Sequence, residues 1–295
     1  MNLERSFRQV VMQSRKKLPK TPSGEQVRPE LYDPQLRWAM RRSRWFNRVR
    51  DGVSAYTVRP FEDWLFRQWL TQGSLASRVE ALGLPRRSVE VHLGNNLDIV
   101  VDPAKLVCSM SLKRSFTDSR KRRTASNRFI WPGDWDLTRF DFQTSQRYRF
   151  ISDIWQHRRD LDQSCAYQDF LEQLNAGKPF RSPHRGVLLN TSLRVWHYLK
   201  LYIGYMEAMA LGGFDDSLGK DRLGVAIDRH GQLIKINKGL HRLAMAQVVG
   251  LETIVVRVRA VHEDWWREVT QGAQGEEALR RLVDALSECE PAQAA

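Results

Sequence analysis

The chain has 295 residues, a formal net charge of +13 and 42% hydrophobic residues. A chain of this length buries a sizeable core in one large domain or two small ones, and its composition excludes an intrinsically disordered protein. No run approaches the roughly 20 apolar residues that span a bilayer, and the N-terminus lacks the apolar centre of a secretion signal. We therefore expect a cytoplasmic protein whose three widely spaced cysteines stay reduced and offer no metal-ligand spacing.

Residues 1–60 form a basic arm, because they contain 14 Lys or Arg against 5 Asp or Glu, a net charge of +9. Leu3 to Leu18 predicts a first helix, residues 19–34 read as a linker, and Gln35 to Val49 predicts a second helix. The second helix interleaves arginines with three aromatic residues, Trp38, Trp45 and Phe46. Three interpretations stay open: the aromatics pack on the body of the protein, or the arm contacts an anionic membrane, or it contacts nucleic acid.

The segment 61–214 reads as mainly helical with one hairpin. Apolar spacing predicts four helices, over Phe61 to Ala81, Arg147 to Arg159, Cys165 to Leu174 and Ser192 to Leu211. A hairpin is expected over Ser88 to Val101, broken at Gly94-Asn95-Asn96. Ser119-Arg120-Lys121-Arg122-Arg123 reads as a cationic loop; such a run is usually just solvated, but this one precedes the next motif and could reach a substrate phosphate.

That motif is Trp131-Pro132-Gly133-Asp134-Trp135-Asp136. Two carboxylates one residue apart can hold a divalent cation such as Mg²⁺ or act as a base, and the tryptophan between them would shield the site from water. The alternative is a turn in which an aspartate caps the next segment and the tryptophans fill the core. Asp134 and Asp136 are therefore candidate catalytic and metal-binding residues.

Gly224 to Val258 is the most informative stretch, because it reads as strand, tight turn at His230-Gly231, strand, Gly-x-His-Arg, helix and strand. Gly250 ends the helix at a position that favours a left-handed residue. A glycine at the helix start lets an anion approach the free N–H groups, and Arg242 adds a forked donor for phosphate. His241 should be neutral there and able to donate to phosphate, the alternative being a buried histidine that backbone carbonyls satisfy.

Gly239-Leu240-His241-Arg242 and the Leu-Ala-Met-Ala-Gln-Val-Val-Gly-Leu that follows resemble the nucleotide-binding core of the ParB/sulfiredoxin superfamily. That superfamily includes chromosome-partition CTPases, sulfiredoxins and small-molecule kinases that act on free serine. The cysteine that sulfiredoxins carry in this motif is Leu240 here, which excludes their sulfur chemistry. The acidic residue that the kinases carry before the glycine is Lys238 here, so their mechanism does not transfer directly.

A wider similarity covers about residues 98–266. Gly-Asp-Trp-Asp upstream of a ParB-like end resembles a group of uncharacterised prokaryotic proteins, some of which are associated with surface-glycan gene neighbourhoods. His262-Glu263-Asp264-Trp265-Trp266 is similar to the His-x-x-Trp ending of the same group. The resemblance makes His262 a further candidate for the cleft and implies no established activity.

We predict an α+β fold, with a ParB/sulfiredoxin-like mixed sheet and helices, plus helical N-terminal and middle segments. The expected divisions are the basic arm at 1–60, the mainly helical region at 61–214, a ParB/sulfiredoxin-like nucleotide-binding unit at 215–266, and a C-terminal helix and tail at 267–295.

The leading prediction for function is a nucleotide-dependent, kinase-like phosphotransferase that acts on a small-molecule or glycan-linked hydroxyl in surface-polysaccharide metabolism. Gly239 to Arg242 would hold the phosphates of a nucleoside triphosphate such as ATP or CTP. Asp134 and Asp136 would bind Mg²⁺ or deprotonate the acceptor, and Lys238 would neutralise charge on the transferred group, with His262 beside them. An anionic membrane surface is a further expected partner, at the inner face of the cytoplasmic membrane.

Two other classes stay open. The first is a ParB-like, nucleotide-gated nucleic-acid clamp, although partition CTPases carry a helix-turn-helix after this unit and little chain remains here. The second is a non-catalytic membrane-surface or scaffold protein that has lost the acid at Lys238.

Overall fold

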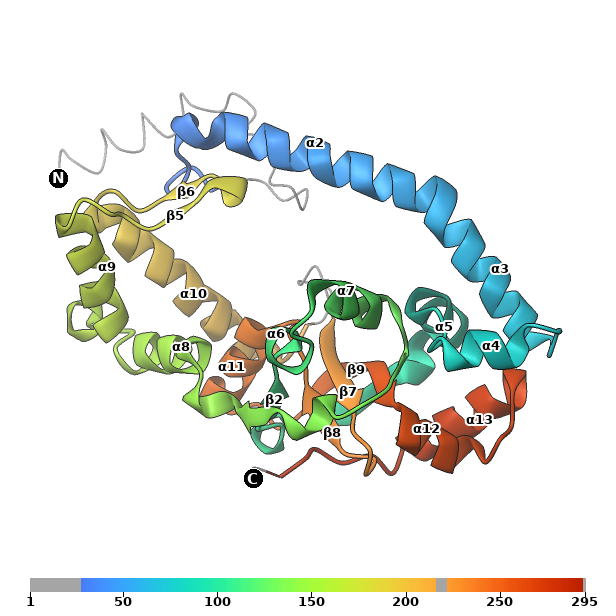
Figure 1. Ribbon diagram of the computed structural model, residues 1–295. Helices are drawn as coiled ribbons and strands as arrows, with labels where there is room; N and C mark the ends of the chain where they lie inside the picture. Colours follow the sequence, from blue (N-terminus) through green and yellow to red (C-terminus); the bar gives the residue numbers. More distant parts are fainter. Residues whose placement is uncertain (1–27, 216–221, 294–295) are drawn as a thin grey trace. The chain divides into compact units, whose positions relative to one another are not determined.

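The computed structural model describes residues 28–215 and 222–293 of the chain (Figure 1). It is an α+β structure, as predicted, with a mixed sheet and many helices. The helix predicted over residues 3–18, and most of the predicted linker, lie outside the described residues.

The chain divides into two compact units. Unit 1 contains the described part of Met1–Ala55 together with Asp153–Tyr205, and unit 2 contains Tyr56–Ser152 and the described part of Met206–Ala295. Among the described residues, no helix is both long and apolar enough to cross a membrane.

Unit 1 is mostly helical. Its elements are α2 (Arg37–Val53), the last residues of α8 (Gln146–Gln156), α9 (Cys165–Asn175), most of α10 (Ser192–Gly212), and a two-stranded ladder of β5 (Arg181–Ser182) and β6 (Val187–Leu188). The three middle helices confirm the sequence prediction. Asp153 fixes the start of α9, because its carboxylate accepts hydrogen bonds from the Ser164 hydroxyl and from the backbone N–H groups of Cys165 and Ala166.

Unit 2 is built around a mixed sheet of seven strands in the described chain. They are β1 (Asp98–Val101), β2 (Cys108–Met110), β3 (Ile130–Trp131), β4 (Arg139–Asp141), β7 (Leu223–Ile227), β8 (Leu233–Lys235) and β9 (Ile254–His262). The order is β1-β9-β7-β8-β2-β4, and β3 pairs with the end of β9 beyond the part that pairs with β1. The pairs β7/β9, β2/β8 and β3/β9 are parallel, and the others are antiparallel.

The centre of the sheet forms the core of unit 2. All five residues of β7 are buried, as expected for a continuous apolar run between two neighbouring strands. The turn from β7 to β8 is held by Asp228, whose carboxylate accepts from the N–H groups of His230 and Gln232, while Gly231 takes a left-handed φ of 79°. β7, β8, α11 (Leu240–Val249) and β9 thus confirm the order of elements predicted over residues 224–258.

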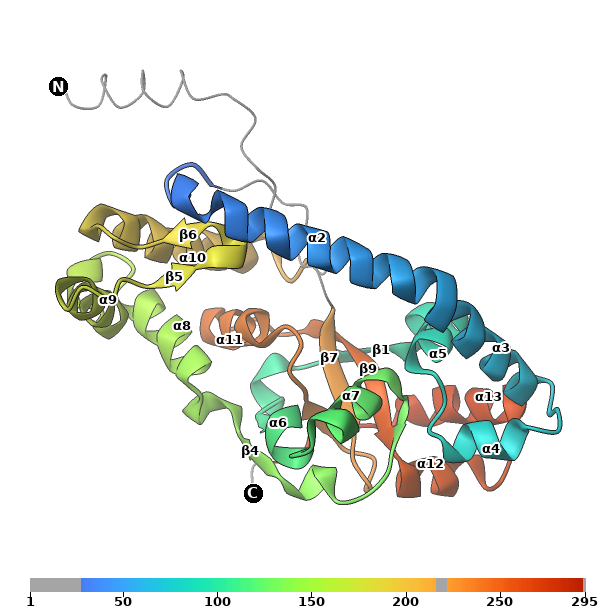
Figure 2. The ribbon, with the colours of Figure 1, turned by 45° about the horizontal axis from the view of Figure 1, so that its top comes forward.

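The other helices of unit 2 are α3 (Arg59–Leu70), α4 (Ala76–Ala81), α5 (Arg86–Leu93), α6 (Leu112–Ser115), α7 (Ser119–Asn127), α12 (Glu263–Thr270) and α13 (Gly275–Leu286). Figure 2 shows α12 and α13 packed side by side, and α11 near the start of β7.

The predicted hairpin over residues 88–101 is wrong. Arg86–Leu93 is the helix α5, and only Asp98–Val101 is a strand, which pairs with β9 rather than with a neighbouring segment. Val89 is fully buried whereas Val91 is 75% exposed, so the two valines do not share a face. The pairing partner of β1 lies more than 150 residues further along the chain, and no local pattern indicates it.

The helix predicted over residues 61–81 is interrupted. α3 ends at Leu70, Gln72 adopts a left-handed φ of 54°, and α4 starts at Ala76. The buried aromatics of α3 are Phe66 and Trp69, whereas Phe61 and Trp64, whose apolar spacing suggested a core position, are exposed.

The cationic run at residues 119–123 is helical rather than a loop. Asp118 caps α7, because its carboxylate accepts a hydrogen bond from the backbone N–H of Arg120 at 2.7 Å. An aspartate at the N-cap satisfies a backbone donor that the helix itself leaves open. The basic residues are therefore displayed on a short rigid element.

Candidate functional site

The two predicted acids are both held by Arg229, which follows β7. Its guanidinium donates to Asp136 Oδ2 at 2.8 Å and Oδ1 at 2.7 Å, and to Asp134 Oδ1 at 2.8 Å. Its backbone N–H also points to Asp136 Oδ2, at 3.3 Å. Trp131 and Trp135 of the same motif are buried in the core of unit 2, where their rings pack edge to face. The tryptophans thus fill the core, as the alternative interpretation of this motif expected.

Asp136 and Asp134 differ sharply in their surroundings. The Asp136 side chain is fully buried, whereas that of Asp134 is 76% exposed. Burial by itself would raise the pKa of Asp136, but the hydrogen bonds from Arg229, with the nearby His262, outweigh burial and lower that pKa below its usual value. Asp136 is therefore a charged, fully paired group.

His262 ends β9 and caps α12. Its Nε2 lies 2.8 Å from the carbonyl oxygen of Gly133, and its Nδ1 accepts from the backbone N–H of Asp264 at 3.1 Å. Both ring nitrogens are thus engaged with backbone groups, and the side chain is 2% exposed.

This arrangement does not fit Mg²⁺. Three of the four carboxylate oxygens of Asp134 and Asp136 already face one guanidinium, so a metal ion would have to displace a paired cation. Elsewhere in the described chain, no group of three or more His, Cys, Asp or Glu side chains is arranged to hold a metal ion.

The predicted phosphate turn lies after β8. Gly239 caps α11 with a left-handed φ of 76°, and a Cβ there would lie 2.4 Å from the Leu223 side chain. Only glycine fits both the dihedral angle and the space. Leu240, His241 and Arg242 form the first turn of α11.

Lys235 stabilises this turn by hydrogen bonds from its side chain to backbone carbonyl groups. Its side chain is fully buried, and Nζ donates to the carbonyl oxygens of Gly224 at 2.8 Å and Ile236 at 2.6 Å, and also to that of Lys238. Burial, together with the charges of Arg259 and Arg242, lowers the pKa of Lys235 well below its usual value. The sequence analysis missed this residue.

Further basic side chains surround the same turn. Arg242 lies over the ring of Phe214, with its Cζ 5.5 Å from the ring centroid. A Cβ placed on Gly224 would meet both Lys238 and Arg259, so these side chains lie next to each other there. Arg259 pairs with Glu90 at 3.2 Å, and Glu90 is shared with Arg86. Among the described residues, several basic side chains therefore gather around the start of α11.

The acid pair and the glycine turn lie at opposite ends of β7. Lys238 accepts a hydrogen bond from Gly224, at the start of the strand, whereas Arg229 comes after its end. Five residues of extended chain at about 3.3 Å each separate Gly224 from Arg229 by about 16 Å. The structure therefore unites Asp134, Asp136 and His262 in one place and Lys238 to Arg242 in another, and does not unite the two groups.

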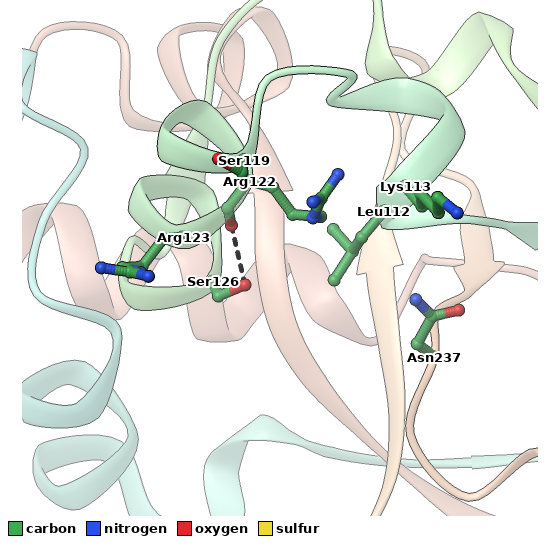
Figure 3. Close-up of a pocket in the computed structure, with 7 residues that line it drawn as sticks. All are labelled: Leu112, Lys113, Ser119, Arg122, Arg123, Ser126 and Asn237. Atoms are coloured by element: carbon green, nitrogen blue, oxygen red, sulfur yellow. Dashed lines mark hydrogen bonds between the residues drawn. The ribbon is translucent and has the colours of Figure 1, made fainter. Parts of the chain in front are cut away.

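A pocket of about 530 Å³ opens near the glycine turn. β2 and β8 are parallel, and Ser109 pairs with Lys235 in their register, so the carboxyl ends of the two strands share one edge of the sheet. α6 follows β2, and Asn237 follows β8. The lining residues are Leu112, Lys113, Ser119, Arg122, Arg123, Ser126 and Asn237 (Figure 3). Crevices outside the carboxyl ends of strands are the usual ligand sites of parallel sheets.

The lining of this pocket is cationic. Three of its residues are Lys or Arg, and none of the seven is acidic. Arg122 is held by one hydrogen bond to the carbonyl oxygen of Phe116 at 3.0 Å, and the Ser126 hydroxyl donates to the Arg122 carbonyl oxygen at 2.8 Å. In Figure 3, Arg122 reaches toward Leu112 while Arg123 extends to the other side of α7. The pocket is suited to an anion.

Sequence reasoning indicated the glycine turn and the cationic run, but not that Asn237, two residues before Gly239, lines one pocket together with residues of that run. It also missed Arg229 and Lys235. Lys235 had one signal, a lysine between apolar residues in Leu233-Ile234-Lys235-Ile236, which predicts a buried position. Arg229 had none, because its partners lie more than 90 residues away.

Comparison of the chain with protein-family models, with curated proteins and with solved structures finds no match.

Proposed function

We propose that this chain is a nucleotide-binding protein whose unit 2 holds the phosphates of a nucleoside triphosphate between the α6–α7 pocket and the start of α11. The observation that carries the proposal is the cationic pocket lined by Asn237, two residues before Gly239. The order of elements over residues 224–258 is also what the ParB/sulfiredoxin resemblance implies.

The physical support is the number and kind of donors. Lys113 and Arg122 supply charged donors, Gly239 lets a ligand approach the backbone, and the N-terminal end of the α11 dipole favours negative charge. The pocket volume is within the range of small-molecule sites, about 300–1,000 Å³.

The phosphotransferase reaction with a hydroxyl acceptor stays a prediction. In that prediction Asp134 and Asp136 bind Mg²⁺ or act as the base. Both are paired with Arg229 at the other end of β7. A transferase would need other groups for those roles. The nucleic-acid clamp and the scaffold protein likewise stay predictions, and nucleotide binding is common to the transferase and the clamp.

The proposal predicts that the double variant Lys113→Gln/Arg122→Gln binds nucleotide much more weakly. Each charged hydrogen bond to phosphate contributes about 1.5–3 kcal/mol, so the loss of one such bond alone weakens binding roughly 10- to 150-fold. Calorimetric titration with ATP, CTP and GTP, each with and without Mg²⁺, measures the effect. Adenosine and tripolyphosphate separate recognition of the base from recognition of the phosphates.

The matched control is Arg120→Gln/Lys121→Gln, which removes the same amount of charge from α7, but from residues that do not line the pocket. We expect near wild-type affinity for this control. Equal weakening of both double variants would mean that only net charge matters, and absence of binding by the wild-type chain would refute the proposal.

A further inference from the structure

One face of α2 is exposed and rich in aromatic residues. Trp38 is 68% exposed, Trp45 60%, Phe46 55% and Val49 44%. At about 100° per residue, positions 38, 45 and 49 point within roughly 40° of one another. Phe46 lies about 80° around the helix from Trp38 and packs against Trp45, with the ring centroids of Phe46 and Trp45 5.1 Å apart. These four residues, here called the aromatic face, form one broad band along α2.

Near its start, the opposite side of the same helix is packed. Met40 is fully buried and contacts the turn at Gly186, where a Cβ would lie 2.5 Å from its sulfur. Arg194 fixes the start of the segment through Asp33 at 3.0 Å and the carbonyl oxygen of Tyr32 at 3.2 Å. The aromatic face is thus presented to solvent by a helix that is held in place.

The aromatic face carries strong positive charge. Between Arg37 and Arg50 the helix has six arginines and no Asp or Glu. Arg42 lies over the rings of Trp38 and Phe46, at 5.5 and 5.9 Å from their centroids. Arg41 and Arg48 are exposed along one flank of the band. The surface therefore combines aromatic rings with arginines that lie between and beside them.

We propose that the aromatic face of α2 docks on an anionic lipid surface, with the helix lying in the plane of the interface. A helix with aromatic residues on one face and arginines beside them buries its rings at the headgroup boundary, while its guanidinium groups pair with lipid phosphates. This surface belongs to unit 1, so it is independent of the nucleotide pocket proposed for unit 2.

Lipid fits this surface better than nucleic acid. Large side chains gathered into one broad band bury apolar area together, which a bilayer interface rewards and salt does not screen. Binding to a phosphate backbone rests mainly on charge and weakens steeply with salt. The two partners therefore predict different salt dependence.

The test uses the full chain in sedimentation with vesicles of phosphatidylcholine alone, and of phosphatidylcholine with one third phosphatidylserine. We expect binding to the anionic vesicles only. Trp38→Ser/Trp45→Ser should weaken vesicle binding at least about tenfold, because two rings that the bilayer interface would bury are lost. Arg41→Gln/Arg48→Gln should weaken it roughly 10- to 30-fold at low salt and less at high salt.

Two control variants match these changes. Leu211→Ser removes a 91% exposed apolar residue elsewhere, and Arg78→Gln/Arg149→Gln removes two exposed arginines outside α2. Both should bind like wild type. Circular dichroism of all variants should be unchanged, because the replaced side chains are exposed.

Three results would overturn the proposal. They are no binding of the wild-type chain to anionic vesicles, binding that the tryptophan variant leaves intact, and binding that the control arginine variant weakens equally. Tight mobility shifts of single- or double-stranded DNA at physiological salt, lost in the tryptophan variant while vesicles are not bound, would assign the face to nucleic acid.

Discussion

Asp136→Asn should destabilise unit 2 by about 3 kcal/mol, because it leaves the Arg229 guanidinium beside a buried amide in place of a buried carboxylate. The carboxylate is fully buried and both of its oxygens accept from Arg229. For a unit of this size the loss corresponds to a fall in the melting temperature of roughly 6–12 °C. Thermal unfolding of wild type and variant measures it.

Asp134→Asn is the matched control, because the two carboxylates share one arginine. The Asp134 side chain is 76% exposed, and exposed ion pairs contribute about 0–1 kcal/mol. We expect a change within that range. Similar, small effects of both substitutions would show that the buried pair does not hold the fold. Loss of nucleotide turnover from Asp134→Asn without loss of stability would restore the catalytic role that the sequence suggested.

The same pair predicts a dependence of stability on pH. The folded-state pKa of Asp136 is lowered below its usual value of about 3.9, so the unfolded chain binds the proton more readily. The stabilisation is therefore complete above about pH 5 and is lost as the pH falls through the lowered folded-state pKa. The difference between wild type and Asp136→Asn should shrink in acid and stay constant from pH 5 to 8.

The sequence predicted local elements well where their signals are local. Gly239 and Gly250 bound α11 with left-handed φ angles of 76° and 75°, as their places in the pattern indicate. The prediction failed where partners are distant. β1 looks like half of a hairpin, but its partner is β9, and no residue within reach of a local pattern encodes that pairing.

The candidate site was predicted in parts rather than as a whole. The glycine turn has a local signature because a glycine, a helix start and an arginine are neighbours in the chain. The acid motif has one too, but Arg229 determines the state of Asp136, and it is 93 residues away. The separation of the acid motif from the glycine turn could not be inferred, since it depends on which end of β7 each segment meets. The register of β7 with β8 and β9 determines which end each segment reaches.

Lys235→Met should remove a large pH dependence of stability and weaken nucleotide binding. The folded-state pKa of Lys235 lies well below its usual value, chiefly because of burial, so the unfolded chain binds more protons in the interval up to about pH 10.5. Stability due to this group therefore rises with pH, by up to about 1.4 kcal/mol per pH unit, until both states are deprotonated. The methionine variant should lack this slope.

Denaturant unfolding of both proteins at several values of pH between 7 and 10 tests this, and Lys105→Met is the control because Lys105 is exposed.

The second expected effect of Lys235→Met is on nucleotide binding. Lys235 Nζ joins the carbonyl oxygens of Gly224, Ile236 and Lys238, so the variant loosens the turn that precedes Gly239. Affinity for ATP should fall about tenfold or more, because a displaced turn loses at least one hydrogen bond to the charged phosphates. If Lys235→Met keeps both the pH slope and the affinity, the lysine neither titrates in the core nor positions the turn. If it loses the slope alone, the turn holds its shape without the lysine, and the phosphate contacts depend on the pocket residues Lys113 and Arg122 instead.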